Sequence, residues 1–352
     1  MIIEQYLPAL HYGDAIGNSA LSLHRALGNK GLQSFIVALS VDECLAGEAE
    51  EFKSWRPRPD AIKILHFAIP SPLTSFFQEN PGKKVLVYHN VTPAHYFVDF
   101  SPSLAGFLQA SREELLSLRD SFDLVLADSS YNGRELEEFG FRNIRTFPLA
   151  VDLDAYEADH SRAFYELLRD ERKTILFVGR VSPNKKIEDL IKMLFFYRKY
   201  LSPSIRLIVA GNTGTLPKYF HAVRDLAARF HLGPEEVFFT GHIPFAELLA
   251  LYRLADVFVS MSEHEGFCLP LIESCFFSLP VMAFDAGAVA ETLGGAGILF
   301  REKQPDRLAA LAEELINNQD TREKMKEKSR ERIDAYRLQA SPDILIELLQ
   351  SL

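Results

Sequence analysis

Short apolar segments alternate with helical patterns along the whole chain, and this alternation constrains the fold more than any other feature. Several apolar segments consist almost entirely of Val, Ile, Leu and Phe, which is typical of parallel strands buried on both faces. The amphipathic segments between them, such as NSALSLHRALGNKG and IEDLIKMLFFYRKYL, predict helices. Repeated strand–helix alternation predicts an α/β fold with parallel sheets. The expected strands are MIIEQYL, QSFIVAL, AIKILHFAI, KKVLVYHN, FDLVLADS, KTILFVGR, IRLIVAG, EVFFTGH, DVFVSMS and PVMAF.

The chain divides into two predicted domains. Its 352 residues suit two domains of ordinary size. The first series of strands ends near residue 150, and KTILFVGR opens a second series after a polar, acidic stretch. We expect Rossmann-like domains over residues 1–150 and 151–334, with parallel sheets whose strand ends face a central cleft. The final segment predicts one or two helices, broken around Ser341 and Pro342.

Net charge and cysteine content exclude several classes of protein. The net charge of −10 is shared about equally between the two halves, which argues against a nucleic-acid-binding protein. The three cysteines, an odd and sparse set, predict a reducing compartment and neither a disulfide framework nor a zinc site. The first residues include Glu4 and no basic segment, and no run of about 18 apolar residues occurs. We therefore expect a cytoplasmic protein without a signal peptide or a membrane span.

The segment ADVFVSMSEHEGFCLPLIE, residues 255–273, holds the most informative constellation. A predicted strand runs through a polar loop into a predicted helix, and Pro270 suits the first helical turn. The first N–H groups of a helix have no acceptor within the helix, and with the helix dipole they favour an anion such as a diphosphate. We expect this anion site at Gly266, Phe267, Cys268 and Leu269.

Charged side chains flank the expected anion site. Glu265 precedes it, and Glu273 follows inside the helix. Because a carboxylate only accepts hydrogen bonds, two carboxylates beside a diphosphate suit hydroxyl groups on either side of it. A nucleotide sugar has this layout, with a ribose diol, two phosphates and a sugar. Arg180 and Lys185 follow the strand KTILFV and would neutralise the diphosphate.

These motifs resemble those of a known family. EGFCLPLIE, from Glu265 to Glu273, is similar to the E-x7-E signature of the retaining group-1 (family 4) glycosyltransferases, which have two Rossmann-like domains in the GT-B fold. GRVSPNK, residues 179–185, resembles the G-R-x-x-P-x-K pattern of that family. The resemblance covers essentially the whole second half. In the first half GDAIGN, VYHN and ADSSYNGREL carry a looser likeness.

The resemblance implies roles for residues of the second half. Glu265 would contact the donor sugar at the reacting centre, and Glu273 would hold the ribose. Arg180 and Lys185 would bind the diphosphate and stabilise its departure.

The first half would contribute Gly17 and His89. Gly17 would let the backbone approach the donor phosphates, and His89 would face the sugar.

Three positions of the second half depart from the family pattern. Cys268 and Lys186 stand where the family often has glycine, and Ala290 stands where it often has proline. Of these, Cys268 matters most, since its side chain narrows the expected anion site.

The resemblance also implies a reaction. A hexose of mannose or glucose type would move from a GDP- or UDP-linked donor to a hydroxyl of a glycan or lipid-linked acceptor, with retention at the anomeric carbon. The expected setting is cell-surface polysaccharide synthesis, with possible peripheral contact at the inner membrane face. Residues 1–150 would bind the acceptor, residues 151–334 the donor, and a helix at about 335–352 would cross back to the first domain. No cofactor and no metal are expected, and the oligomeric state is left open.

Other readings of the same residues are weaker, and one stays open. Acid and base carboxylates of glycosidases lie about 5–9.5 Å apart. Glu265 and Glu273 are eight residues apart, and a fully helical path between them would span roughly 12 Å. Asp152 and Asp154 form a D-x-D, which favours a capped turn over a metal site. GDAIGN lacks the G-x-G-x-x-G of a dinucleotide site, which argues against a dehydrogenase. A nucleotide-sugar epimerase, or a non-catalytic nucleotide-sugar-binding protein on the same scaffold, remains the alternative.

Overall fold

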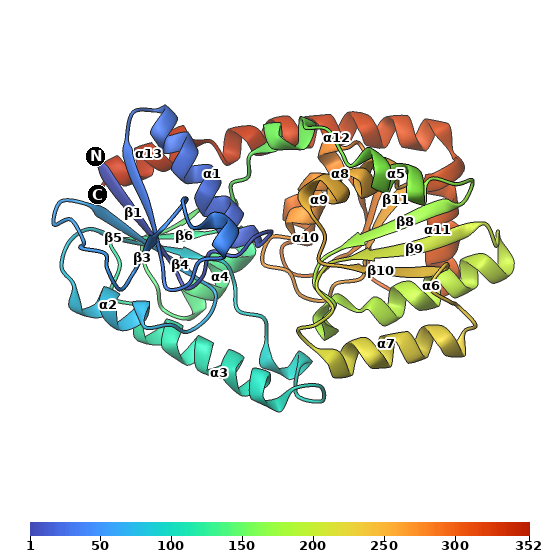
Figure 1. Ribbon diagram of the computed structural model, residues 1–352, viewed down its shortest axis with the longest axis horizontal. Coiled ribbons are helices and arrows are strands. Elements are labelled where there is room, and N and C mark those ends of the chain that lie inside the picture. Colours follow the sequence, from blue (N-terminus) through green and yellow to red (C-terminus); the bar gives the residue numbers. More distant parts are fainter. The chain divides into compact units, whose positions relative to one another are not determined.

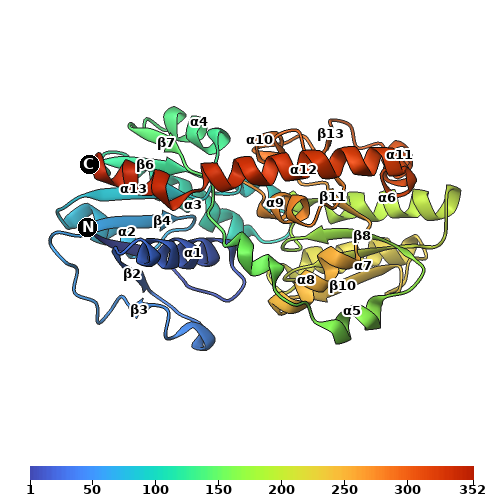
Figure 2. The ribbon, with the colours of Figure 1, turned by 90° about the horizontal axis from the view of Figure 1, so that it is seen from above.

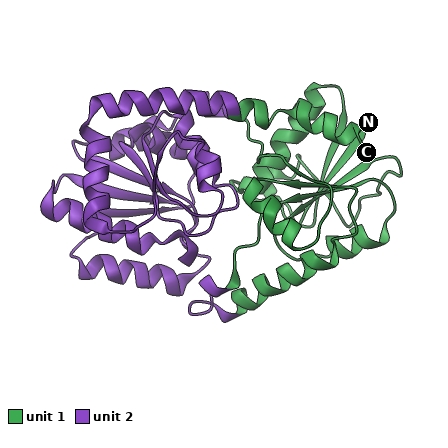
Figure 3. Ribbon diagram, turned by 180° about the vertical axis from the view of Figure 1, so that it is seen from behind, with its two compact units in different colours: residues 1–94, 103–152, 336–352 green, residues 95–102, 153–335 purple.

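The computed structural model describes all residues from 1 to 352, and they form two compact units. Unit 1 contains residues 1–94, 103–152 and 336–352, and unit 2 contains residues 95–102 and 153–335 (Figure 3). Each unit has its own parallel sheet with helices on both faces (Figures 1 and 2). The fold class is therefore the predicted α/β class with two Rossmann-like units.

Unit 1 is built on a seven-stranded parallel sheet with the order β3-β2-β1-β4-β5-β6-β7. One face is covered by α1 and by the C-terminal helix α13, whose Leu345 and Leu349 are buried in the same apolar cluster as Leu23 and Leu27 of α1. Figure 1 shows α2 and α3 on the other face. The strands are β1 (Ile2–Leu7), β2 (Gln33–Ala38), β3 (Glu50–Glu51), β4 (Ile62–Phe67), β5 (Lys84–Tyr88), β6 (Leu124–Ala127) and β7 (Ile144–Thr146). The helices are α1 (Ala15–Asn29), α2 (Leu73–Glu79), α3 (Pro102–Ser117), α4 (Ser130–Glu138) and α13 (Pro342–Gln350).

Unit 2 is built on a six-stranded parallel sheet with the order β10-β9-β8-β11-β12-β13. The strands β8, β9, β11 and β12 are almost completely buried, as their continuous apolar sequences predict. The strands are β8 (Lys173–Val178), β9 (Ile205–Ala210), β10 (Val237–Gly241), β11 (Val257–Ser260), β12 (Val281–Phe284) and β13 (Ile298–Phe300). The helices are α5 (Arg162–Leu168), α6 (Ile187–Tyr200), α7 (Pro217–Arg229), α8 (Phe245–Leu254), α9 (Leu269–Phe276), α10 (Val289–Leu293), α11 (Pro305–Asn317) and α12 (Gln319–Gln339).

All ten predicted strands are present, and three further strands were not predicted. These are β3, β7 and β13, which have only two or three residues each and so carry no readable alternation. Helix α3 begins at Pro102, well before the predicted segment SREELLSLRDS. Gly106 and the exposed Phe107 weaken the helical pattern in its first half. The C-terminal segment forms two helices that break at Ser341, as predicted.

Residues 95–102 belong to unit 2 although they lie between β5 and α3 of unit 1 in the sequence. Phe100 packs edge-on against Tyr219 of α7, with ring centroids 5.1 Å apart, and Lys218 donates a hydrogen bond to the carbonyl of Asp99. The aromatic segment 95–100 therefore serves packing within unit 2. No helix of the chain combines the length and the apolar character needed to cross a membrane.

Candidate active site

Two loops at the carboxyl ends of neighbouring strands bring Lys185 and Glu265 together in unit 2. β8 and β11 are adjacent in the sheet, so the loops that follow them start side by side. The ammonium of Lys185 lies 2.6 Å from Oε1 of Glu265, and the two side chains are only 17% and 8% exposed. Lys185, which is predicted to bind the diphosphate, and Glu265, which is predicted to contact the sugar, thus form an ion pair with each other in the free protein.

Asn184 ties the two loops together, and the sequence analysis did not identify it. The N–H of Glu263 donates to the carbonyl of Asn184 over 2.8 Å. The side-chain amide of Asn184 donates to the carbonyl of His264 over 3.3 Å, and the hydroxyl of Ser182 donates to its Oδ1 over 2.8 Å. Since Asn184 is buried, it fixes the backbone on both sides of the Lys185–Glu265 pair.

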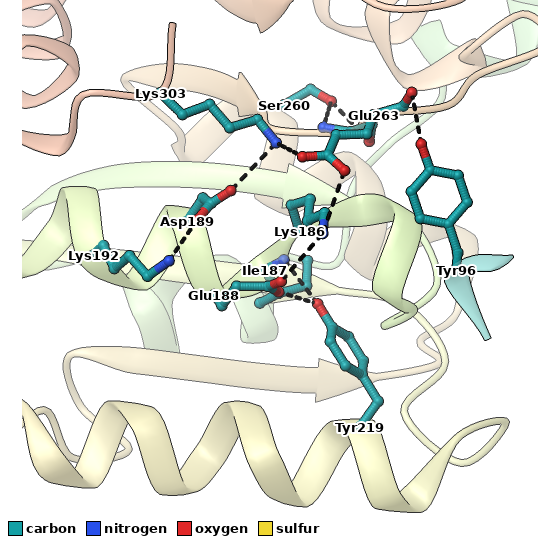
Figure 4. A network of polar contacts seen from close by, with 11 residues as sticks. Tyr96, Lys186, Ile187, Glu188, Asp189, Lys192, Tyr219, Ser260, Glu263 and Lys303 are labelled. Atoms are coloured by element: carbon teal, nitrogen blue, oxygen red, sulfur yellow. Dashed lines mark hydrogen bonds and ion pairs between the residues drawn. The ribbon is translucent and has the colours of Figure 1, made fainter. Parts of the chain in front are cut away.

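A network of ion pairs supports the same two loops (Figure 4). The carboxylate of Glu263 lies 2.8 Å from the ammonium of Lys303 and 3.3 Å from that of Lys186. Lys303 also lies 3.3 Å from Asp189 of α6, and the hydroxyl of Tyr96 donates to the carbonyl of Glu263 over 3.2 Å. Residues from three separate segments therefore hold Glu263, two positions before Glu265.

Gly287 lies directly against the backbone of Glu265. Its φ is +59°, and a Cβ at this position would stand 2.4 Å from the carbonyl oxygen of Glu265 and 3.0 Å from its nitrogen. The next residue, Ala288, donates its N–H to the same carbonyl over 2.9 Å. The sequence analysis did not identify this glycine, because only the fold shows what it contacts.

The expected anion site lies at the start of α9, where Cys268 is the N-cap residue and Pro270 stands in the first turn. Cys268 adopts a left-handed conformation (φ 72°, ψ 66°), which favours glycine. Burial, reinforced by the charge of Glu265, raises the pKa of its thiol well above the usual range, so the thiol is neutral. Phe267 is buried, and its carbonyl accepts a hydrogen bond from Thr292 of α10.

Glu273 is buried inside α9 and is held by two tyrosines. Its side chain accepts hydrogen bonds from the hydroxyl of Tyr156 (2.6 Å) and from that of Tyr252. Burial raises the pKa of Glu273, and the two hydroxyl donors oppose this shift. Each carboxylate oxygen can accept a second hydrogen bond, which leaves room for a ribose hydroxyl. Contact between Glu273 and a ribose stays a prediction. Neither tyrosine was identified from the sequence, because nothing in their spacing links them to Glu273.

Arg180 is exposed and makes no ion pair. The loop that carries it is fixed by close packing between the ends of β8 and β9. A Cβ on Gly211 would stand 2.2 Å from the carbonyl oxygen of Gly179, and Val181 donates its N–H to the carbonyl of Asn212 over 3.0 Å. The backbone of Arg180 is thus rigid while its guanidinium is available to a ligand.

The two residues predicted from the first half lie in unit 1, and both are already engaged there. Both ring nitrogens of His89 have partners, His66 at 2.9 Å and Asp128 at 2.8 Å, and the side chain is only 2% exposed. Gly17 lies in the first turn of α1, and its N–H donates to the side chain of Asp14 over 3.1 Å. Their contact with a donor stays a prediction.

The D-x-D segment forms the start of a short helix. Leu153 to Glu157 is a 3-10 helix that follows the boundary between the units at Asp152. No three acidic, histidine or cysteine side chains of the chain are grouped as a metal site requires. Metal independence itself stays a prediction.

The chain is similar in sequence to known glycosyltransferases. The family described as Glycosyl transferases group 1 matches residues 162–332. A serotype-specific mannosyltransferase, WbdA of Escherichia coli, is 23% identical over 276 residues. These residues are 74% of this chain and 33% of that relative, so this chain spans about a third of the relative's length.

Solved structures share the fold over the full length of the chain. HepE of Anabaena, in complex with UDP-glucose, superposes with a TM-score of 0.76 at 16% identity and covers 100% of both chains. WaaG, a glycosyltransferase involved in lipopolysaccharide biosynthesis, superposes with a TM-score of 0.73 at 15% identity and covers 99% of both chains. At this level of identity the similarity establishes the fold, which is GT-B.

Proposed function

Residues 162–332 belong to the group 1 glycosyl transferases, and on that premise we propose that the protein transfers a hexose from a nucleotide diphosphate sugar to a hydroxyl acceptor. The configuration at the anomeric carbon is retained, and no metal or other cofactor takes part. Unit 2 binds the donor, and the acceptor is a glycan or a lipid-linked glycan.

The pairing of Lys185 with Glu265 carries this proposal. An isolated charge that is this strongly buried is costly, so the two groups neutralise each other in the free protein. A nucleotide sugar offers a replacement for each partner: its diphosphate takes the ammonium of Lys185, and its sugar hydroxyls donate to Glu265. When the donor binds and separates Lys185 from Glu265, it therefore provides a new partner for each charge.

The remaining residues of unit 2 complete the proposed donor site. Arg180 is the exposed, unpaired cation of the β8 loop and binds the diphosphate. The start of α9, at Gly266 to Leu269, adds N–H donors and the positive end of the helix dipole. Glu273 accepts the ribose hydroxyls on its second lone pairs, with the tyrosines holding its orientation.

The proposed chemistry depends on stabilising the leaving group. Lys185, Arg180 and the start of α9 hold the negative charge that develops on the departing diphosphate. The acceptor hydroxyl attacks from the face on which the diphosphate leaves, so the configuration is retained, and its proton passes to an oxygen of the leaving diphosphate. Glu265 orients the sugar and forms no covalent bond.

Mannose and glucose are the proposed sugars, from GDP- or UDP-linked donors. The similarity to a mannosyltransferase supports mannose, and the similarity to a protein solved with UDP-glucose supports a UDP-linked hexose. The likeness to a lipopolysaccharide enzyme supports a role in cell-surface polysaccharide synthesis. We place the reaction in the cytoplasm, with peripheral contact at the inner face of the membrane.

Calorimetric titration of UDP, GDP and ADP without metal tests the donor site. One nucleotide is expected to bind, and Lys185→Ala should abolish that binding. Lys199→Ala, on α6 away from the site loops, is the control and should leave it unchanged. Absence of binding by all three, with and without Mg²⁺, would contradict the proposal.

The alternative functions on this scaffold differ in their products. A transferase releases nucleoside diphosphate quickly only when an acceptor is present. An epimerase converts the donor sugar without any acceptor, and a binding protein changes nothing. Analysis of the donor after incubation with and without a glycan acceptor separates the three.

A further inference from the structure

A buried polar relay crosses four neighbouring strands of unit 1. It runs from Gln5 of β1 through His66 of β4 to His89, which follows β5, and ends at Asp128, which follows β6. These strands stand side by side in the order β1-β4-β5-β6. The successive distances are 3.1 Å from Gln5 Oε1 to His66 Nε2, 2.9 Å from His66 Nδ1 to His89 Nε2, and 2.8 Å from His89 Nδ1 to Asp128 Oδ2.

The carbonyl of Ala20 fixes the direction of every hydrogen bond in this relay. Nε2 of Gln5 donates to that carbonyl over 3.1 Å, so Oε1 of Gln5 must accept from His66. Burial and the adjacent His89 lower the pKa of His66, which keeps its ring neutral. With its proton on Nε2, His66 can only accept at Nδ1. Therefore Nε2 of His89 carries a proton and donates it to His66.

The far end of the relay has an unsatisfied acceptor beside a cavity. One proton lies between His89 Nδ1 and Asp128 Oδ2, whichever of the two groups carries it. Oδ1 of Asp128 is buried and has no hydrogen-bond partner. Asp128 borders a cavity of ≈ 10 Å³ that is also lined by Ser19 of α1 and Leu345 of α13. This is the smallest space that admits one water molecule, and an unpartnered carboxylate oxygen requires a donor.

We propose that His66 and Asp128 are positioning residues for His89, and that one internal water molecule, donating to Oδ1 of Asp128, completes the relay. Both ring nitrogens of His89 are held, so the ring keeps one tautomer and one orientation. Because the His89 side chain is enclosed while its residue is partly exposed, the surface that it presents is main chain. His89 thus acts by fixing the turn that begins at Asn90, whose φ is +71°.

Nitrogen-15 NMR of the histidine rings tests the relay without any assay of activity. The wild-type protein should show His89 protonated at Nε2, and Asp128→Asn should preserve this tautomer, because its amide can donate to Nδ1. Asp128→Ala should broaden or shift the His89 signals, while His24→Gln, in α1 outside the relay, should leave them unchanged. An unprotonated Nε2 on His89 in the wild-type protein would overturn the proposal.

The internal water has its own readout. A nuclear Overhauser effect between a long-lived water and protons of Ser19 or Leu345 is expected in the wild-type protein and in Asp128→Asn. Its absence from the wild-type protein would refute the water, and the histidine spectra would still decide the rest of the relay.

The activity measurement rests on the proposed function and is kept separate. Asp128→Ala should lower kcat at least 10-fold, Asp128→Asn less than 3-fold, and both should bind nucleoside diphosphate within 2-fold of wild type, because that site lies in unit 2. An unchanged kcat in Asp128→Ala would refute the positioning role. A wild-type protein that transfers no sugar would instead count against the proposed function, while the NMR result would stand.

Discussion

At the scale of single residues, two side chains at the candidate site occupy backbone conformations that suit glycine. Cys268 (φ 72°) precedes α9, and Lys186 (φ 53°) precedes α6. Both are positions where the family resemblance leads one to expect glycine. A left-handed conformation costs an ordinary residue about 1–2 kcal/mol, so the chain retains these side chains at a cost in stability. For Lys186 the ion pair with Glu263 offsets part of that cost.

Replacing Cys268 by glycine should therefore stabilise the fold. We expect Cys268→Gly to raise the free energy of unfolding by up to about 1 kcal/mol, since relief of strain exceeds the added flexibility of the unfolded chain. Cys268→Ala keeps a Cβ and the strain, and should show no gain. Thermal unfolding of both variants checks this, and a less stable glycine variant would mean that thiol packing outweighs the backbone strain.

Removing Lys185 or Arg180 from the β8 loop should impair catalysis strongly, and Lys185→Ala should also lower stability because it leaves the buried Glu265 without its partner. Lys185→Ala and Arg180→Ala should each lower kcat/KM by about 10²–10³, the effect of deleting a group that stabilises charge in the transition state. Steady-state kinetics with the donor identified by calorimetry measures this, with Lys199→Ala as the matched surface control. Losses below about 3-fold in both variants would exclude these residues from leaving-group stabilisation.

At the scale of elements, the site is a set of strand-end loops that are fixed to one another by backbone contacts. The sequence predicted the strands and the start of α9, because these depend on local pattern, whereas the roles of the charged residues toward a ligand stay predictions. Asn184, Gly287, Tyr156 and Tyr252 were not predicted. Their importance comes from contacts with Glu263, Glu265 and Glu273, and in every case the two partners lie at least 21 positions apart in the sequence.

Gly287→Ala should damage the site through the β12–α10 loop. The methyl group of the alanine would overlap the carbonyl of Glu265, and the backbone φ of +59° at this position is unfavourable for alanine. We expect a loss of about 1–3 kcal/mol in stability and at least a 10-fold loss in kcat/KM. Gly295→Ala has the matched unfavourable φ (+87°) but meets nothing within 4 Å, so it should lose stability and keep activity. Equal activity in the two variants would refute the contact.

Glu273 should make stability depend on pH through its packing between α9, α8 and the 153–157 segment. Because its pKa is raised above the ordinary 4.5, the folded protein binds this proton more tightly than the unfolded chain. Wild-type stability is therefore lost as pH rises from about 4.5 through the folded pKa. In Glu273→Gln this loss is absent. The difference between the Tm of the variant and the Tm of the wild type should therefore increase as the pH rises from about 4.5 through the folded pKa, and stay constant at higher pH.

The same variant should bind its nucleotide more weakly, by roughly 1 kcal/mol or about fivefold, since a neutral amide replaces a charged acceptor. Unfolding curves at several pH values, with the exposed Glu323→Gln as control, measure the first effect. Calorimetry measures the second, and unchanged affinity would show that Glu273 does not contact the ribose.

At the scale of the whole molecule, the chain passes between its two units at four places, after residues 94, 102, 152 and 335. The sequence predicted the seam near residue 150 because a second strand series begins there. It did not predict that residues 95–102 pack with unit 2, because an aromatic segment carries no signal for the surface on which it packs.

Phe100→Ala should consequently destabilise unit 2 although it changes the first half of the chain. Loss of its packing on Tyr219 should cost about 1–3 kcal/mol. Thermal unfolding measures this, and the unfolding transition of unit 2 is identified as the one whose Tm rises when nucleotide is added. Phe107→Ala, a half-exposed position on α3 in unit 1, is the control. A shift confined to the other transition would contradict this assignment.

The interleaved chain path also limits how such a protein can be recombined. A crossover with a relative at the seam near residue 150 would join residues 153–335 to a foreign copy of residues 95–102, whose Tyr96, Asp99 and Phe100 contact residues of that range. Functional chimaeras should therefore be those in which these eight residues travel with residues 153–335. For recombination, the segment 95–102 therefore has to be treated as part of the second half of the chain, although it lies in the first half of the sequence.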